Sequence, residues 1–427
     1  MTNNRKWYRL DNTGKIYPSI TSTRVSTVFR ISATITTRVE PAKLQKALDN
    51  IIERFPYFKV NLRRGLFWYY FEYVNHNPVV KKEIFYPCMF MLFKKKKTFP
   101  FRILYYNKKI SCEFSHSITD GTGALKFLQT LLVEYFRLVG VECQIPSYIF
   151  NKNSYVKQEE YEDSSHKYYK KNIPPPDYPK KAIHFPFKLN RKGEYYIITG
   201  IINVSRAKEE SKIHGCSITE FLLAIYFETI QDYVYSRSVG RRRHLKRRIV
   251  INLPVNLRRI FPSNTMKNFF ISITPNIDLR LGKYNREELI KLVKNYMEIN
   301  INEKHLSQYI SRNVKNEKNK FIRIIPLFIK NMIMPIVYQR FGERGYTSGL
   351  SNLGLITMPR EIENLIERFE FYPPPSKGNI VKMGIASYKD KIYISFGRLT
   401  KVTEIEKIFF RKIRKMDIPV KIETNLR

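Results

Sequence analysis

The stretch Ile110–Phe127 constrains the fold of this chain more than any other segment. Its first part alternates apolar and polar residues, which is typical of a half-buried strand: Ile110, Cys112 and Phe114 against Ser111, Glu113 and Ser115. The pattern then changes, because apolar residues recur at helical spacing after Gly121. The sequence therefore predicts a strand that turns directly into a helix.

The turn between these two elements carries a histidine, followed four residues later by an aspartate and a glycine. These residues are His116, Asp120 and Gly121. A histidine at a strand end can take up a proton near neutral pH, since its reference pKa is about 6.5. The aspartate is poorly suited to that task, but it can fix the loop through an arginine partner. Glycine at position 121 allows a sharp turn and a close approach by neighbouring atoms.

The residues from His116 to Gly121 match the signature H-x-x-x-D-G, and the flanking strand and helix lie where that signature needs them. The chain resembles the acyltransferase superfamily that includes chloramphenicol acetyltransferase, condensation domains, wax ester synthases and alcohol acetyltransferases. It is most similar to the bacterial alcohol acetyltransferase-like branch. The resemblance implies an α+β fold (an α/β sandwich) of two related subdomains with mixed sheets, flanking helices and an active-site tunnel between them. The alternative is a histidine that merely closes a buried turn.

A proline-rich segment around Pro174–Pro176 divides the chain into two parts. With 427 residues, the chain has room for about two to three domains. We predict an N-terminal acyltransferase subdomain over 1–165 with the histidine motif, a linker over 166–192 and a C-terminal acyltransferase subdomain over 193–427.

An arginine follows a predicted strand, about ten residues before a second aromatic strand. The resemblance assigns this residue, Arg258, as the buried bidentate partner of Asp120, with Arg259 in reserve. The second superfamily signature, D-F-G-W-G, appears only as Asn268-Phe-Phe-Ile-Ser272, without the aspartate and both glycines.

The segment Ser351-Asn352-Leu-Gly354 resembles the S-N-L-G element of the alcohol acetyltransferase-like branch. That element implies a strand that passes close to the catalytic histidine. Ser351 and Asn352 are therefore candidate hydrogen-bond donors to a developing oxyanion or to the acceptor. The alternative is a plain turn between strands.

The implied reaction uses His116 as a general base, acyl-CoA as co-substrate and an alcohol or amine as acceptor, with no covalent acyl-enzyme. No cofactor and no metal are expected to be bound, and the other six histidines are interpreted as surface or structural. The motifs G-x-S-x-G, G-x-G-x-x-G and the P-loop are absent from the sequence. Two alternatives remain: acyl transfer from the thioester of an acyl carrier protein, and a non-enzymatic basic protein that binds polyanions or membranes.

The chain is strongly basic, with 76 lysines and arginines against 37 acidic residues and a net charge of +39. We attribute this charge to a composition rich in lysine, asparagine, isoleucine and tyrosine, with a modest contribution from contacts to cofactor phosphates. Two basic runs, Lys94–Lys97 and Arg241–Arg248, are interpreted as solvated loops, with phosphate contact as the alternative. No nucleic acid is expected as a partner, whereas peripheral contact with an anionic membrane stays an alternative.

Four widely spaced cysteines argue against a zinc site and a disulfide framework, and they fit a reducing cytoplasm. The N-terminal residues 1–10 lack an apolar core, so no signal peptide is predicted and a cytoplasmic location is expected. The apolar stretch Phe321–Phe341 is interrupted by charges and prolines and is not a membrane span. We predict a helix packed in the core there, with a membrane-surface or acyl-cleft contact as the alternative.

Overall fold

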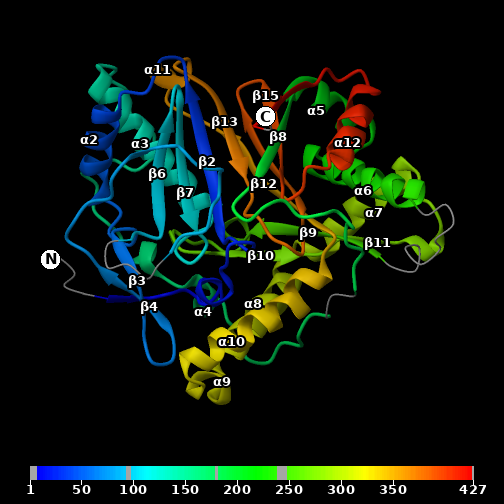
Figure 1. The fold of residues 1–427 in the computed structure, drawn as a ribbon, viewed down its shortest axis with the longest axis horizontal. Helices are drawn as coiled ribbons and strands as arrows, with labels where there is room; N and C mark the ends of the chain where they lie inside the picture. Colours follow the sequence, from blue (N-terminus) through cyan, green and yellow to red (C-terminus); the bar gives the residue numbers. More distant parts are fainter. Residues whose placement is uncertain (1–6, 93–97, 178–180, 238–247, 426–427) are drawn as a thin grey trace.

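The computed structural model describes residues 7–92, 98–177, 181–237 and 248–425. Two lobes stand side by side in Figure 1, and each has a mixed sheet with helices packed against it. This arrangement confirms the predicted α+β class with two mixed-sheet subdomains. The basic run Lys94–Lys97 and residues 241–247 of the second basic run lie outside the described residues, so both interpretations stay predictions.

The sheet of the first lobe has the order β13-β2-β7-β6-β5, and its pairs are antiparallel except for β5 with β6. Its strands are β13 (Ile366–Tyr372), β2 (Val28–Ile35), β7 (Lys109–Ser115), β6 (Phe101–Tyr106) and β5 (Lys81–Lys82). A small antiparallel sheet joins β1 (Trp7–Arg9), β4 (Tyr69–Tyr73) and β3 (Val60–Arg64). The helical elements of this half are α1 (Tyr17–Ile20), α2 (Pro41–Ile52), α3 (Gly121–Val139), η1 (Gln158–Tyr161) and α4 (Ser164–Lys167).

The sheet of the second lobe has the order β10-β9-β12-β14-β15-β8-β16, and β11 pairs with β9. Its interior strand β12 is parallel to both neighbours, β9 and β14. The strands are β8 (Tyr196–Asn203), β9 (Arg248–Asn256), β10 (Phe270–Ile273), β11 (Asn276–Asp278), β12 (Ser348–Ile356), β14 (Val381–Tyr388), β15 (Lys391–Arg398) and β16 (Lys421–Thr424).

The helices of the second half lie against its sheet and below it in Figure 1, except for α11, which lies at the top of the first lobe. They are α5 (Val204–Ile213), α6 (Ile218–Arg237), α7 (Arg286–Asn300), α8 (Glu303–Lys318), α9 (Lys320–Ile324), α10 (Leu327–Val337), α11 (Arg360–Glu363) and α12 (Glu404–Arg414). Short helical turns connect them: η3 (Leu257–Arg259), η4 (Leu279–Leu281), η5 (Tyr338–Gly342) and η6 (Glu343–Gly345).

Local signals in the sequence account for where several helices begin. Pro41 occupies the first position of α2, where its missing N–H costs no hydrogen bond. Ser217 and Glu220 form the predicted capping box of α6, in which each side chain accepts a hydrogen bond from the other residue's backbone N–H. The helix after the histidine motif, α3, ends at Gly140 with a φ of 100°, a left-handed conformation that glycine adopts at little cost.

One strand of the second half belongs to the sheet of the first half. β13 pairs with β2 in antiparallel fashion, so that Phe369 faces Ala33 and Phe371 faces Ile31. These side chains join a core that consists mainly of residues from the first half. The two lobes are therefore interlocked, and the histidine strand β7 lies next to β2 in the same sheet. The domain limits at 165, 166–192 and 193 remain predictions.

The prediction of a core-packed helix over Phe321–Phe341 is wrong. The segment divides into α9, α10 and η5 because Pro326 cannot continue a helix. Many of its apolar side chains face outward: Phe321 is 78%, Phe328 67% and Met332 72% exposed. In the described part of the chain, no helix has the length and apolar character needed to cross a membrane.

Candidate active site

His116 follows directly after β7, and its backbone N–H donates to the Thr27 carbonyl at 2.9 Å. The imidazole stacks on Tyr17 with the ring centroids 5.2 Å apart, and the Phe29 centroid lies 4.4 Å away. The ring centroid of Phe270, from the second half, lies 5.7 Å from that of the imidazole. The histidine therefore sits where the two halves of the chain meet, enclosed by aromatic rings from both.

Burial keeps this histidine neutral at physiological pH. It lowers the pKa of His116 from 6.5 to about 4, because the charged imidazolium is poorly solvated there. A hydrogen bond with Asn268 and the charge of Asp120 oppose this shift, while the nearby ammonium of Lys382 adds to it. A neutral imidazole has a lone pair available, which is the state that a general base requires.

Asp120 is held by four hydrogen bonds from the protein itself. It is the N-cap of α3, and its Oδ1 accepts from the backbone N–H groups of Thr122 at 3.1 Å and Gly123 at 3.2 Å. Its Oδ2 accepts from Arg258 Nη1 at 2.7 Å and from the Phe269 N–H at 2.8 Å. Both oxygens of the carboxylate are thus engaged in hydrogen bonds within the protein. Asp120 is therefore suited to positioning the turn that carries His116 rather than to proton transfer.

Arg258 connects this turn to a loop of the second half. Nη1 reaches Asp120, whereas Nη2 donates to the carbonyls of Thr265 at 2.9 Å and Lys267 at 2.7 Å. The predicted partner therefore lies beside the aspartate, but the prediction of a bidentate pair is wrong: the other hydrogen bonds of the guanidinium go to the carbonyls of Thr265 and Lys267 and to the Asn256 side chain. Arg259, the predicted reserve, is exposed.

Asn268 links the histidine to a buried carboxylate that sequence reasoning missed. Its Nδ2 donates to the His116 carbonyl at 2.8 Å and to Asp11 Oδ2 at 2.9 Å, and its Oδ1 lies 3.4 Å from His116 Nδ1. Burial, with a contribution from Asp163, raises the pKa of Asp11 to about 7. The only signal for Asn268 in the sequence was its place at the aspartate position of the second signature.

The two glycines in the first turn of α3 meet different neighbours. A Cβ atom at Gly121 would stand 2.7 Å from Cδ2 of Leu353, the end of a side chain that can move. A Cβ atom at Gly123 would stand 2.7 Å from the Met266 carbonyl oxygen, which belongs to the backbone. The steric demand is therefore stricter at Gly123, which sequence reasoning did not single out.

Ser351 and Asn352 lie within β12, so the alternative of a plain turn between strands is wrong. The next residue, Leu353, is the one that approaches Gly121. Asn352 Nδ2 donates to Thr219 Oγ1 at 2.9 Å, and its Oδ1 accepts from the Gly354 N–H at 2.8 Å. The Asn352 side chain is thus engaged with the start of α6, and the oxyanion role of both residues stays a prediction.

Lys382 is a further residue near the histidine that the sequence did not suggest. Its Nζ donates to the Pro374 carbonyl at 3.0 Å, and its Cγ lies 3.9 Å from where a Cβ atom of Gly349 would stand. Burial lowers the pKa of this amine to about 8. Because its charge acts on His116, Lys382 contributes to keeping the imidazole neutral.

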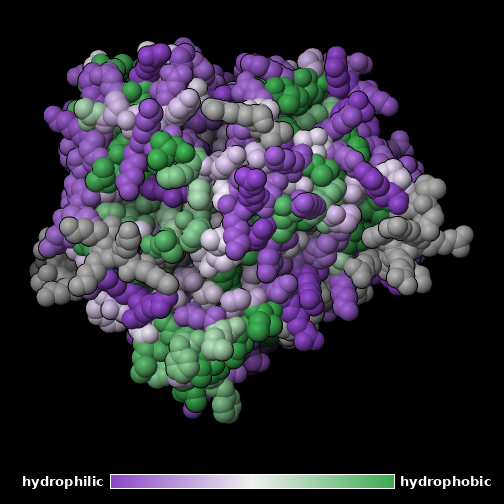
Figure 2. All heavy atoms as spheres, in the orientation of Figure 1, coloured by the Kyte–Doolittle hydropathy of each residue, from purple (hydrophilic) through white to green (hydrophobic). Residues whose placement is uncertain are grey.

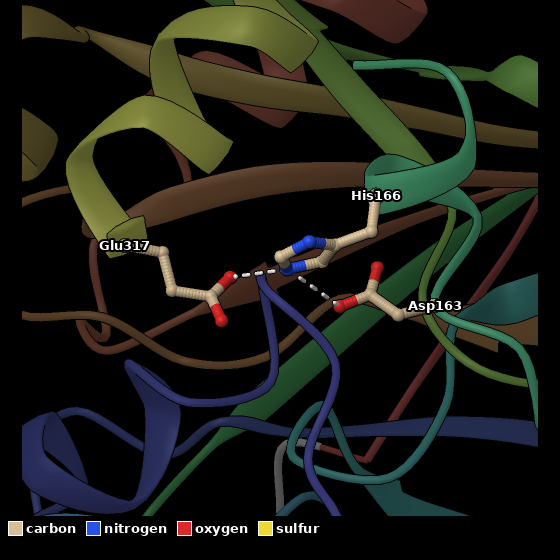
Figure 3. A group of neighbouring side chains, drawn as sticks. All are labelled: Asp163, His166 and Glu317. Carbon is tan, nitrogen blue, oxygen red and sulfur yellow. Dashed lines mark hydrogen bonds and ion pairs between the residues drawn. The ribbon is translucent and has the colours of Figure 1, made fainter. Parts of the chain in front are cut away.

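A second group of titratable side chains consists of Asp163, His166 and Glu317 (Figure 3). His166 Nε2 is 2.9 Å from Glu317 Oε2 and 3.8 Å from Asp163 Oδ2, and the three side chains are close enough to share a metal ion. Glu317 also accepts hydrogen bonds from Lys15 and Asn12. Since protein donors already surround this carboxylate, we interpret the group as ion pairs that fasten α4 and the N-terminal segment to α8.

Comparison with known proteins identifies the fold that carries this site. No protein-family model and no characterised protein sequence matches the chain. Solved structures do match over almost its whole length. TRI101 from F. sporotrichioides, complexed with coenzyme A and T-2, superposes with a TM-score of 0.62 at 10% identity, covering 97% of this chain and 99% of that one. The chain has the fold of the acetyltransferases and condensation domains.

Two further structures support this assignment. TRI3, the trichothecene 15-O-acetyltransferase from Fusarium sporotrichioides, gives a TM-score of 0.59 at 11% identity and covers 96% of this chain and 94% of its own. The starter condensation domain of rhizomide synthetase RzmA gives 0.56 at 12% identity, with coverage of 96% and 94%. The likeness confirms the resemblance to the chloramphenicol acetyltransferase and condensation-domain superfamily at the level of fold. At such identities it does not fix the reaction.

Proposed function

We propose that this protein is an acyltransferase in which His116 acts as the general base. The observation that carries the proposal is the environment of His116, a neutral imidazole fixed at the junction of the two lobes by the turn that Asp120 and Arg258 hold. No covalent acyl-enzyme is required, because the base acts directly on the acceptor.

The hydrogen bonds of Asn268 indicate which nitrogen of His116 acts as the base. Asn268 Nδ2 donates to two oxygens, so its Oδ1 is the atom that faces His116 Nδ1. A hydrogen-bond acceptor beside Nδ1 favours the tautomer with the proton on Nδ1, which leaves the lone pair on Nε2. Nε2 is therefore the atom that takes the proton of the acceptor alcohol or amine.

In the proposed reaction, the acceptor oxygen or nitrogen attacks the thioester carbonyl while its proton passes to His116 Nε2. The tetrahedral intermediate carries an oxyanion, for which Ser351 and Asn352 are the proposed donors. Its collapse breaks the carbon–sulfur bond, and Nε2 returns the proton to the leaving thiolate. The histidine thus ends the cycle in its starting state.

We propose acyl-CoA as the donor and a small-molecule alcohol or amine as the acceptor, as expected of the alcohol acetyltransferase-like branch. Complexes of TRI101 with coenzyme A and of RzmA with C8-CoA support a CoA thioester on this fold. Domains of nonribosomal peptide synthetases share this fold, so a carrier-protein thioester is the alternative donor. The four cysteines are free, which favours the reducing cytoplasm as the place of the reaction.

The test is release of free thiol from acetyl-CoA and longer acyl-CoAs with a panel of alcohols and amines. We expect acceptor-dependent release, with kcat/KM reduced about 10²- to 10⁴-fold in His116→Ala. The matched control is His305→Ala, because this histidine contacts Asn302 away from the site. Release from an acylated carrier protein alone would identify the alternative donor. An active His116→Ala variant would contradict the assignment of the base.

A further inference from the structure

The segment α9–α10 and the neighbouring β3–β4 turn expose a continuous set of apolar side chains, which we name the apolar tip. In Figure 2 it forms the hydrophobic patch at the lower end of the molecule, where α9 and α10 project in Figure 1. The exposed residues of the tip are Leu66, Phe67, Phe321, Ile322, Ile324, Phe328, Met332, Ile333, Ile336 and Val337. Scattered apolar residues are normal on protein surfaces, but a gathered patch of this kind marks an interaction site.

The apolar tip is an ordered structure, because hydrogen bonds join α10 to the β3–β4 turn. The Leu327 N–H donates to the Leu66 carbonyl at 2.8 Å, at the start of α10. Lys330 is only 5% exposed; its Nζ donates to the Phe67 carbonyl at 2.9 Å and lies 3.6 Å from the centre of the Trp68 ring. A buried lysine therefore fastens the turn to the inner side of α10 while the apolar side chains point outward.

The two segments that build the apolar tip carry charge of one sign. No acidic residue occurs between Glu53 and Glu72 or between Glu317 and Glu343, the two segments that build the tip. Exposed cations border the apolar side chains: Arg64, Lys318, Lys320 and Arg323. Apolar side chains that enter the acyl region, beside cations that meet lipid phosphates, are the pattern of a protein that lies on an anionic membrane.

We propose that the apolar tip docks this protein onto the surface of an anionic lipid membrane. A membrane accounts for both features at once, since it offers apolar depth and negative charge at its surface. A second copy of this chain would bring the bordering cations of two tips together, which like charges oppose. Because α9 and α10 are short, the mode of contact is insertion of side chains from one face rather than a spanning helix.

The docked tip would lie close to the candidate active site. α10 contacts α1, whose Tyr17 stacks on His116. Tyr338, the residue that follows α10, acts together with burial to raise the pKa of Tyr17. We therefore expect acceptors or acyl chains that are themselves dissolved in the membrane. This step, unlike docking, rests on the proposed function.

The experiment is co-sedimentation of the full chain with vesicles of phosphatidylcholine alone or mixed with phosphatidylglycerol. We expect binding to the anionic vesicles, reduced about tenfold or more in Phe328→Ser/Met332→Ser/Ile336→Ser. A second variant, Phe321→Ser/Ile324→Ser, changes α9 alone and should also bind more weakly. The matched control is Ile213→Ser/Leu281→Ser, since these residues are 71% and 80% exposed and lie outside the tip. Circular dichroism and thermal unfolding establish that each variant is folded.

His116→Ala should bind vesicles as the unchanged protein does, so failure of the proposed function and failure of docking are separable. Equal binding by the tip variants and the control would overturn the proposal, as would equal binding to neutral and anionic vesicles. A dimer that dissociates in the tip variants, without vesicle binding, would also overturn it and identify the tip as an interface between copies.

Discussion

Arg258 Nη1 lies 2.7 Å from Asp120 Oδ2, and this contact joins residues 138 positions apart in the chain. The arginine holds two carbonyls of its own loop at the same time, so the turn after β7 and the loop before β10 form one unit. Since His116 and Asn268 belong to these two segments, the geometry of the candidate site depends on the pair.

Arg258→Ala should therefore destabilise the fold and weaken catalysis together. Both side chains are about nine-tenths buried, at 10% and 6% exposure, and removal of one partner leaves an uncompensated charge. The expected loss in free energy of unfolding is about 3–5 kcal/mol, measured by urea unfolding. Arg259→Ala, at the exposed neighbour, is the control and should change stability by no more than about 0.5 kcal/mol. Equal effects of the two variants would contradict a structural role for the pair.

The rate of acyl transfer should keep its full value to unusually low pH. Burial lowers the pKa of His116 to about 4, so the base loses its lone pair only when the pH falls through that value. The profile of kcat/KM should therefore have its acid limb near pH 4 rather than near 6.5. An NMR titration of the His116 ring, assigned by its absence in His116→Gln, measures the same pKa without substrate. A ring that titrates near 6.5 would disprove the proposed environment.

Asn268→Asp should move that acid limb to higher pH. The substitution removes the donor that serves Asp11 and the His116 carbonyl, and it places a second carboxylate beside the imidazole. A nearby negative charge favours the protonated ring and so raises the pKa of His116. Asn268→Ala is the matched control: it lacks both the hydrogen bond and the new charge, so its acid limb should not rise. The pH profiles of kcat/KM for the two variants show whether the acid limb shifts because of the new charge or because packing is lost.

The sequence predicted those parts of the structure that depend on neighbours in the chain. The alternation before His116, the helical spacing after Gly121 and the capping box at Ser217 are local patterns, and the structure has a strand, a helix and a cap at these places. The contact of Arg258 with Asp120 is long-range, and only a family resemblance could indicate it.

Other features lay beyond sequence reasoning for physical reasons. β13 pairs with β2 across more than 330 positions, and no local period encodes which strand a segment joins. The apolar residues of α10 predict burial, but hydrophobicity alone does not say whether the rest of the protein or a lipid membrane would cover them. Asn268 and Asp11 were missed because each is unremarkable in its own segment, and their relation to His116 exists only after folding.

The ion pair between His166 and Glu317 should make stability depend on pH in a defined window. The hydrogen bond that His166 donates to Glu317 raises the pKa of His166 above 6.5, although burial opposes this. Burial raises the pKa of Glu317, but hydrogen bonds from His166 and Lys15 and the charge of Lys15 together lower it to about 2. The histidine thus stabilises the fold below pH 6.5 and loses this effect as the pH rises through its folded pKa. The glutamate stabilises the fold above pH 4.5 and loses this effect as the pH falls toward 2.

The pair is therefore fully effective between about pH 4.5 and 6.5. His166→Gln keeps a hydrogen-bonding side chain but cannot carry the charge, so its melting temperature should fall furthest below that of the unchanged protein in this window. The difference should shrink as the pH is raised to about 9, because the native imidazole then loses its proton as well. His305→Gln is the matched control, since this ring contacts the uncharged Asn302 and its substitution should not produce the same pH dependence. A constant difference for His166→Gln across the series would mean that shape and packing, rather than charge, hold α4 to α8.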